Sequence, residues 1–213
     1  MRSQNPPRIL TVCGSLGGAS ANRSLLDVVH RRLVERGVRF TDDELLASIP
    51  PLQPHLVDEP GDEVASFRRQ IADADAVIIA APEYAGSLAG TIKNALDWIV
   101  GSGELYEKPV GVLSAGTSGG PLARQTLVRT LAWQGSHTVA HLGVAAPRTK
   151  SDASGAIDDP ATLRALTAFT DAVLAAVRLS VAEREVVSAQ VAASLGVGRH
   201  LDGQLLAVFG GFD

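Results

Sequence analysis

Short apolar runs without alternation, each followed by a polar loop and then by apolar residues at helical spacing, recur along this chain. One run covers residues 76–81 (AVIIAA) and is typical of a strand buried on both faces of a parallel sheet. Pro82, Gly86 and Gly90 interrupt the run and predict a loop. The helix predicted after this loop has its apolar face at Ile92, Ala95, Leu96 and Ile99.

The same order of elements is predicted before and after this segment. We expect other strands over residues 8–13 and 108–114, a short strand with its exit over residues 38–46, and a fifth strand within residues 138–146. The first helix should end near Gly37, with its apolar face at Leu25, Leu26, Val29, Leu33 and Val34. Further helices are expected over residues 64–74, 122–133 and 160–179. Residues 49–61 carry four prolines and predict an irregular surface loop.

Five alternations of strand and helix predict an α/β fold in three layers, with a parallel sheet between helices. Right-handed crossovers and short connections favour a doubly wound five-stranded sheet with the strand order 2-1-3-4-5. The loops after strands one, three and four would then meet at the carboxyl edge of the sheet, where such sheets bind ligands. Because all three loops are rich in glycine, we predict one shared ligand site.

The loop after the first strand combines glycines with Ser15, Ser20 and Asn22 and leads directly into a helix. Free N–H groups and the dipole at a helix start favour an anion, and hydroxyl and amide groups can bind phosphate oxygens. Ser20 or Asn22 can alternatively serve only as the helix N-cap. Neither a Gly-Lys-Ser/Thr sequence nor a GxGxxG pattern accompanies the loop. We therefore expect the phosphate of a mononucleotide cofactor rather than a hydrolysed triphosphate.

The composition suits one domain with a substantial core, since 46% of the 213 residues are hydrophobic and 20% are charged. The formal net charge of -4 argues against nucleic acid or an anionic membrane surface as the main partner. No apolar stretch reaches the roughly 18 residues of a membrane span, and the N-terminus lacks a signal-peptide core. We expect a cytoplasmic protein in which the single Cys13 is either a small buried residue or a reactive thiol.

Two motifs carry a family resemblance. The first is Gly14-Ser15-Leu16 with Ser20 and Asn22, and the second is Pro82-Glu83-Tyr84 followed by Gly86-Ser87, Gly90, Lys93-Asn94-Ala95 and Asp97-Trp98. Together they resemble the NADPH-dependent FMN reductase family, which has the flavodoxin-like fold and includes quinone, chromate, azo-dye and flavin reductases. The resemblance covers roughly residues 8–178, and the second motif is the more specific one.

The resemblance implies FMN as the cofactor and assigns three parts of its site. The phosphate would be held by Ser15, Ser20, Ala21 and Asn22. The ring and ribityl chain would lie along Pro82, Glu83, Tyr84, Gly86 and Ser87. The loop that closes over the ring would contribute Ser114, Gly116, Gly119 and Gly120. Because the flavin carries the redox chemistry, no catalytic side chain and no metal are implied, and Tyr84 either stacks near the ring or packs the loop.

The resemblance also implies an activity. Hydride would pass from NADPH or NADH via bound FMN to quinones or similar small acceptors by a ping-pong mechanism, in a homodimer or homotetramer. One alternative is a flavin reductase that supplies reduced FMN to a monooxygenase. Another is an FMN electron-transfer protein without NAD(P)H activity of its own, and a third is a flavin-free binding protein with a degenerate site.

Two positions depart from the family pattern. Many relatives carry arginine where this chain has Gly17. That difference would remove a charge-assisted contact to the phosphate, unless Arg23 supplies it. Many relatives also carry proline where this chain has Ala89, which would alter only the stiffness of the loop.

Several polar or aromatic side chains have more than one interpretation. Glu83 would contact a partner subunit or only solvent. Arg124 would reach a nicotinamide phosphate or remain a solvated helix residue. We expect Trp98 in the core or in a dimer interface, and we expect surface or core positions for His137 and His141 rather than a role in proton transfer.

Residues 180–213 lie beyond the family domain, which we place at residues 1–179. A further helix is predicted by Val186, Val187, Val191 and Leu195, and residues 205–209 (LLAVF) are apolar. We expect this extension to pack across a neighbouring subunit or over the flavin mouth, or alternatively on its own domain.

Overall fold

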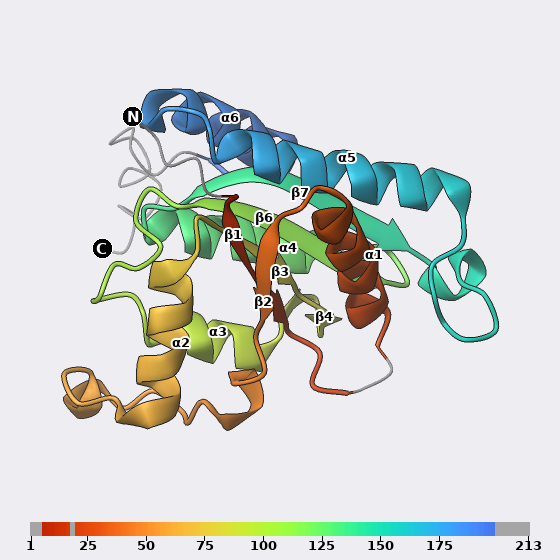
Figure 1. Cartoon of the computed structure of the whole chain (residues 1–213). Coiled ribbons are helices and arrows are strands. Elements are labelled where there is room, and N and C mark those ends of the chain that lie inside the picture. The colour runs from red at the N-terminus through yellow and green to blue at the C-terminus, as the bar shows by residue number, and fades with distance from the viewer. Residues whose placement is uncertain (1–5, 18–19, 199–213) are drawn as a thin grey trace, which may run out of the picture.

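The computed structural model describes residues 6–17 and 20–198, which form a five-stranded parallel sheet between two layers of helices (Figure 1). The strand order is β2-β1-β3-β6-β7, while β4 and β5 pair with each other in a separate hairpin. Counted among the sheet strands alone, this is the order 2-1-3-4-5. The predicted doubly wound α/β fold is therefore confirmed.

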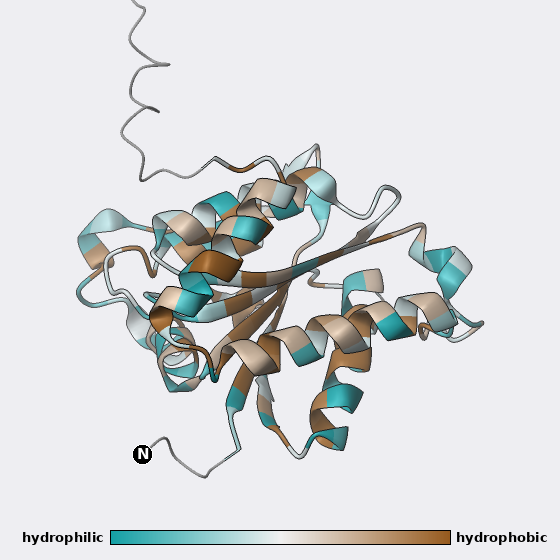
Figure 2. Ribbon diagram, turned by 90° about the horizontal axis from the view of Figure 1, so that it is seen from above, coloured by the Kyte–Doolittle hydropathy of each residue, from teal (hydrophilic) through white to brown (hydrophobic). Residues whose placement is uncertain are grey.

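Apolar runs form the middle of the sheet. The strands are β1 (Arg8–Cys13), β2 (Arg39–Asp42), β3 (Ala76–Ala80), β6 (Pro109–Gly116) and β7 (His137–Ala145). β1, β3 and β6 are buried almost throughout, because helices cover both of their faces. Figure 2 shows these strands in hydrophobic colours, surrounded by helices that mix hydrophobic with hydrophilic residues.

Helices cover both faces of this sheet. They are α1 (Ala21–Glu35), α2 (Gly61–Asp73), α3 (Gly90–Asp97), α4 (Pro121–Trp133), α5 (Pro160–Ala176) and α6 (Val181–Ser194). α1 and α5 pack in one core cluster on one face, whereas α2, α3 and α4 pack in a second cluster on the other face. The connections hold three short 3-10 helices, Leu46–Ser48, Pro54–Leu56 and Pro147–Lys150.

The last helix of the described residues, α6, lies against β7 at one end of the sheet. Val187 packs against the cluster of α1 and α5, while Ala192 and Leu195 pack against the opposite cluster. The helix predicted for this segment is thus confirmed, and its described part packs on its own domain. The apolar residues 205–209 lie outside the described residues.

The structure places the end of one predicted strand and corrects one predicted helix residue. The short strand and its exit expected over residues 38–46 are present, since β2 ends at Asp42. The chain turns there because the carboxylate of Asp43 accepts hydrogen bonds from the N–H groups of Leu45 (3.2 Å) and Leu46 (3.1 Å). Val34 was expected on the apolar face of α1 but is 66% exposed, because it lies about 100° around the helix from the buried face.

The second family motif also anchors the proline-rich loop. Asn94 Nδ2 donates to Pro50 O (2.8 Å), and Asn94 Oδ1 accepts from the N–H of Leu52 (2.9 Å). The indole Nε1 of Trp98 donates to the same Pro50 oxygen (2.8 Å). Trp98 is only 1% exposed, so the prediction of a core position is confirmed.

Candidate functional site

Three loops leave β1, β3 and β6 side by side, because these strands are neighbours in the sheet. We call them the first loop (residues 14–20, described except 18–19), the hairpin loop (residues 81–89) and the glycine loop (residues 117–120). The N–H of Gly14 donates to Ala80 O (2.8 Å). A Cβ on Gly14 would lie 2.6 Å from Ile92 and 2.9 Å from Pro82, so only glycine permits this approach.

Asn22 joins the first loop to the end of β6. It is 3% exposed, and its Oδ1 accepts from the N–H of Ala115 (2.9 Å). Its Nδ2 donates to Ala115 O (3.4 Å) and to Ser15 Oγ (3.3 Å). The buried Asn22 side chain thus holds Ser15 at the edge of the sheet. A contact of Asn22 itself with a phosphate stays a prediction.

The start of α1 suits an anion. Ser20 is the N-cap, and its Oγ accepts from the N–H of Arg23 (3.1 Å), so the predicted capping role is confirmed. A hydroxyl that accepts one bond still has its own hydrogen to donate, so capping and phosphate binding are compatible. The N–H groups of Ala21 and Asn22 precede the first intrahelical bonds, and the first turn contains no acidic residue.

The hairpin loop is more regular than the sequence predicted. β4 (Glu83–Tyr84) and β5 (Ser87–Leu88) are antiparallel and enclose a two-residue turn. Ala85 (φ 51°) and Gly86 (φ 71°) are both left-handed, as a type I′ turn requires. Tyr84 is 60% exposed at this turn, so its ring is available for stacking.

Glu83 ties the hairpin loop to α4. Its Oε2 accepts hydrogen bonds from the N–H groups of Leu122 (2.7 Å) and Ala123 (3.0 Å). A carboxylate is stabilised there by the free N–H groups and by the helix dipole. The alternative that this side chain contacts only solvent is thus wrong, since it caps a helix of its own chain, and its contact with a partner subunit stays a prediction.

The backbone conformation of the glycine loop requires glycine at two positions. Gly119 (φ 78°) and Gly120 (φ 60°) both have left-handed backbones. A Cβ on Gly120 would lie 2.0 Å from Ser114 Oγ. Ser114 is fully buried beneath the loop, and its hydroxyl finds no hydrogen-bond partner among the described residues. A contact of the Ser114 side chain with a flavin stays a prediction. The burial of Ser114 disfavours that contact.

Gly116 and Gly17 have a different character. Neither has a positive φ, and a Cβ on either would meet nothing within 4 Å. Backbone geometry and packing therefore leave both glycines unexplained. The open space beside Gly116 at the end of β6 and beside Gly17 in the first loop fits a ligand that approaches the main chain closely.

The edge carries little charge. Residues 14–22, 82–90 and 114–122 contain no lysine or arginine and one acid, Glu83, which caps α4. The whole chain has 23 acidic residues, so this distribution is uneven. Hydroxyl groups instead line the edge, from Ser15, Ser20, Ser87, Thr117 and Ser118. A phosphate and an uncharged aromatic ring system suit such a surface, so the described residues fit FMN.

Arg124 connects the glycine loop with α6 through His141. It lies across β7, where its Nε donates to Gly119 O (3.2 Å) and its Nη1 donates to His141 Nδ1 (2.7 Å). Since an arginine only donates, His141 carries its proton on Nε2 and donates it to Ser194 Oγ (3.0 Å). Burial lowers the pKa of Arg124, and burial followed by the Arg124 charge lowers the pKa of His141. Arg124 is therefore half-buried and stabilises the glycine loop, instead of being a solvated helix residue.

Arg23, the alternative phosphate ligand, is bound elsewhere. Its guanidinium forms an ion pair with Asp42 of β2. The other oxygen of Asp42 accepts from Thr11 Oγ1 (2.9 Å), which fixes the carboxylate. In this conformation Arg23 does not supply the phosphate contact that an arginine at position 17 would make.

The remaining chemistry of the described residues is limited. Residues 6–17 and 20–198 contain no group of three or more histidine, cysteine, aspartate or glutamate side chains placed to hold a metal ion. Cys13 is 4% exposed, which confirms the buried alternative. Over the same ranges, the helices lack the combination of length and apolar character needed to cross a membrane.

The structure brings the predicted site residues together at one edge of the sheet. Those with exposed or partly exposed surface are Ser15, Ser20, Ala21, Glu83, Tyr84, Gly86, Ser87 and Gly116. Those buried beneath them are Asn22, Pro82, Ser114, Gly119 and Gly120. Thr117 and Ser118 are exposed in the glycine loop and were missed, although their hydroxyls within the AGTSGG run were a usable signal.

Comparison with known proteins identifies relatives. The family model described as NADPH-dependent FMN reductase matches residues 7–150. A rice protein (Oryza sativa subsp. japonica), named probable NADPH:quinone oxidoreductase 1, is 35% identical over 115 residues, which are 51% of this chain and 58% of that protein. A 2-hydroxy-1,4-benzoquinone reductase from Burkholderia sp is 39% identical over 92 residues, 43% of this chain and 49% of the relative. The matches thus span about half the length of these relatives.

A solved structure extends the similarity over most of the chain. The flavoenzyme NAD(P)H:(acceptor) oxidoreductase FerB from Paracoccus denitrificans superimposes with a TM-score of 0.68 at 26% sequence identity. The superposition covers 80% of this chain and 97% of FerB. Flavodoxin 1 from Bacillus cereus, at 15% identity and a TM-score of 0.56 over 81% of this chain and 99% of its own, shows the shared fold.

Proposed function

Because this chain belongs to the NADPH-dependent FMN reductase family, we propose that it is an FMN-dependent enzyme that uses NADPH or NADH to reduce quinones or similar small acceptors. Two matched relatives are named for quinone reduction, and FerB is named as a flavoenzyme that uses NAD(P)H. Bound FMN would supply the electron-transfer chemistry, and the protein would bind and orient it.

The observation that carries the proposal is the edge formed by the three loops, which offers N–H groups and hydroxyls without a free acid. Ser15 and Ser20, with the N–H groups at the start of α1, would hold the phosphate. The hairpin loop and the main chain at Gly116 would line the ring. Asn22 and Glu83 would act as positioning residues, because they fasten the first loop and the hairpin loop to the β6–α4 region.

We propose that donor and acceptor bind in turn at the same open face, as a ping-pong mechanism requires. The exposed rim of the site is apolar, with Leu16 56%, Tyr84 60% and Leu122 47% exposed. Such a rim suits flat aromatic molecules, including quinones. Parallel lines in double-reciprocal plots of rate against NADPH at several quinone concentrations are expected, and intersecting lines would contradict a ping-pong order.

The first test is an absorbance spectrum of the purified protein before and after anaerobic NADPH. We expect flavin bands that bleach with NADPH and return when benzoquinone is added. Bands that persist with both NADPH and NADH would instead indicate an electron-transfer protein. A colourless protein that also fails to bind added FMN would overturn the flavin assignment.

Gly17 favours a second candidate function, a flavin reductase that releases reduced FMN to a monooxygenase. The three loops contain no cation, and Arg23 is paired with Asp42, so the phosphate would be held by N–H and hydroxyl groups alone. Weak retention of FMN suits a dissociable substrate. Gel filtration followed by flavin analysis separates the two functions, since a resident cofactor stays with the protein and a dissociable substrate does not.

We further propose a homodimer or homotetramer in the cytoplasm. Val100 and Tyr106, which lie outside the three loops, are 62% and 67% exposed and offer apolar contact area between copies. Light scattering coupled to gel filtration is expected to give two or four times the chain mass, and a monomer would contradict the proposal.

A further inference from the structure

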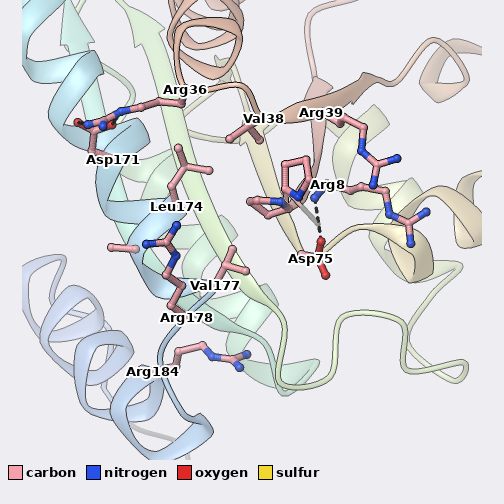
Figure 3. A pocket seen from close by; sticks show the side chains of 13 residues that line it. Arg8, Arg36, Val38, Arg39, Asp75, Asp171, Leu174, Val177, Arg178 and Arg184 are labelled. Atoms are coloured by element: carbon pink, nitrogen blue, oxygen red, sulfur yellow. Dashed lines mark hydrogen bonds and ion pairs between the residues drawn. The ribbon is translucent and has the colours of Figure 1, made fainter. Parts of the chain in front are cut away.

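A cavity opens at the amino edge of the sheet, opposite the three loops. It has a volume of about 1010 Å³ and lies between the starts of β1 and β2 and the ends of α1 and α5 (Figure 3). The cavity is rich in arginines, namely Arg8, Arg36, Arg39, Arg178 and Arg184. Two carboxylates, Asp75 and Asp171, also line it. The excess of positive charge contrasts with the net charge of -4 of the chain.

Both carboxylates are already engaged by the protein. Asp171 binds the guanidinium groups of Arg32 (2.6 Å) and Arg36 (2.8 Å). Asp75 Oδ2 accepts from the main-chain N–H of Arg8 (2.8 Å). These two carboxylates therefore leave the cavity with more arginines than acids.

Structural roles explain three of the arginines. Arg36 caps α1 and Arg178 follows the end of α5, and cations are favoured at helix C-termini. The guanidinium of Arg184 donates to the main-chain oxygens of Leu179 and Glu107. These three side chains stabilise the fold without a ligand.

Arg8 and Arg39 lack such an explanation. They begin two parallel strands and are paired directly in register, so two like charges stand side by side. Both are exposed, and Figure 3 shows their guanidinium groups next to each other on one side of the cavity. Within the described ranges, neither guanidinium has a hydrogen bond or an ion pair to a protein acceptor. An anion bound by both would convert this repulsion into charge-assisted hydrogen bonds.

The floor of the cavity between the two groups of arginines is apolar. Val38, Leu174 and Val177 are partly buried there and extend the core cluster of α1 and α5 to the cavity. A ligand that covers this floor would gain from burying an apolar body. β1 separates the cavity from the three loops by six residues, or roughly 20 Å.

We propose that this cavity binds a small organic anion with an apolar body, whose phosphate or carboxylate is held by Arg8 and Arg39. The apolar body lies on Val38, Leu174 and Val177. The site is separate from the three loops and does not depend on the proposed reductase function.

Isothermal titration calorimetry with excess FMN in cell and syringe tests the proposal, because free FMN then masks any phosphate binding at the first loop. The probes are octyl phosphate below its micelle concentration, sodium octanoate and inorganic phosphate. We expect octyl phosphate or octanoate to bind at least tenfold more tightly than inorganic phosphate. Their relative affinities distinguish a phosphate from a carboxylate ligand. Absence of binding by both amphipathic probes would overturn the proposal.

Variants locate the binding. The double variant Arg8→Gln/Arg39→Gln should lose at least tenfold in affinity for the tighter probe, whereas Arg69→Gln/Arg129→Gln removes two exposed charges elsewhere and should lose less than twofold. Leu174→Ser should reduce the preference for octyl over inorganic phosphate. An equal loss in both double variants would overturn the site, since it would show only a general charge effect. Circular dichroism of each variant confirms that the comparison is between folded proteins.

Discussion

At the scale of single residues, Glu83 fixes the relative position of two loops that belong to different strands. One carboxylate oxygen accepts both N–H groups at the start of α4. The one negative charge of this edge is thereby placed where the helix dipole favours it. Glu83 thus balances its own charge and joins the hairpin loop to α4.

Glu83→Gln tests this role. We expect a loss of about 0.5–2 kcal/mol in the free energy of unfolding, because the amide cannot supply the charged cap. FMN binding should weaken as well, since the hairpin loop is no longer fastened to α4. Urea unfolding and fluorescence titration with FMN measure the two effects. The matched control is Glu59→Gln on an exposed loop, and equal losses in both variants would contradict a specific role.

Gly17→Arg should strengthen FMN binding. The backbone at this position is not left-handed and a Cβ meets nothing within 4 Å, so the side chain can be accommodated. A charge-assisted contact to the phosphate contributes about 1.5–3 kcal/mol, or roughly a tenfold to hundredfold lower dissociation constant. Fluorescence quenching of FMN measures the constant. Gly17→Gln supplies a long neutral side chain, and the prediction fails if it binds FMN as tightly as the arginine variant.

At the scale of elements, the hairpin stores local strain. Ala85 occupies the first position of a type I′ turn with a φ of 51°, which favours asparagine or glycine. We expect Ala85→Asn to raise the free energy of unfolding by about 0.5–1 kcal/mol, since asparagine tolerates the left-handed region. Ala85→Val should lower it by a similar or larger amount because a β-branched side chain clashes there. Urea denaturation ranks the three proteins, and any order other than Asn, Ala, Val would contradict a type I′ turn.

Local patterns explain which elements could be predicted from sequence. Buried strands such as β3 and helices such as α4 leave apolar runs and helical spacing, so both were expected close to their observed bounds. The hairpin was missed because Ala85 hides the usual Asn-Gly pattern. The Glu83 cap and the Arg124–His141 contact join residues that are 39 and 17 positions apart. Such contacts depend on which strands are neighbours, and no local spacing encodes them.

At the scale of the whole molecule, burial determines how stability depends on pH. Burial is the main cause that lowers the pKa of His30, His137 and His141. An unfolded histidine titrates near pH 6.5, so below that pH the unfolded chain binds more protons than the fold. The contribution is fully present above about pH 6.5 and decreases as the pH falls toward the lowered pKa values. We expect the free energy of unfolding to change little between pH 7.5 and pH 6.5 and to drop as the pH falls from about 6.5 toward 5.5.

Urea unfolding at several pH values checks this dependence. His141→Gln should make the free energy of unfolding depend less steeply on pH, because one of the three histidines with a lowered pKa is gone. The hydrogen bonds of His141 are lost at every pH and therefore do not change this slope. A slope that is insensitive to His141→Gln would show that this histidine does not contribute.

The position of α6 affects how copies of the chain can join. Open strand edges are templates for pairing with another chain. α6 packs against β7 and both core clusters, so it obstructs extension of the sheet at that end. Among the described strands, the opposite end is β2, which is four residues long and begins at Arg39. Pairing of strands between copies is thereby hindered at both ends of the sheet. Removal of residues 180–213 should make the protein prone to aggregation before it alters the fold of the sheet.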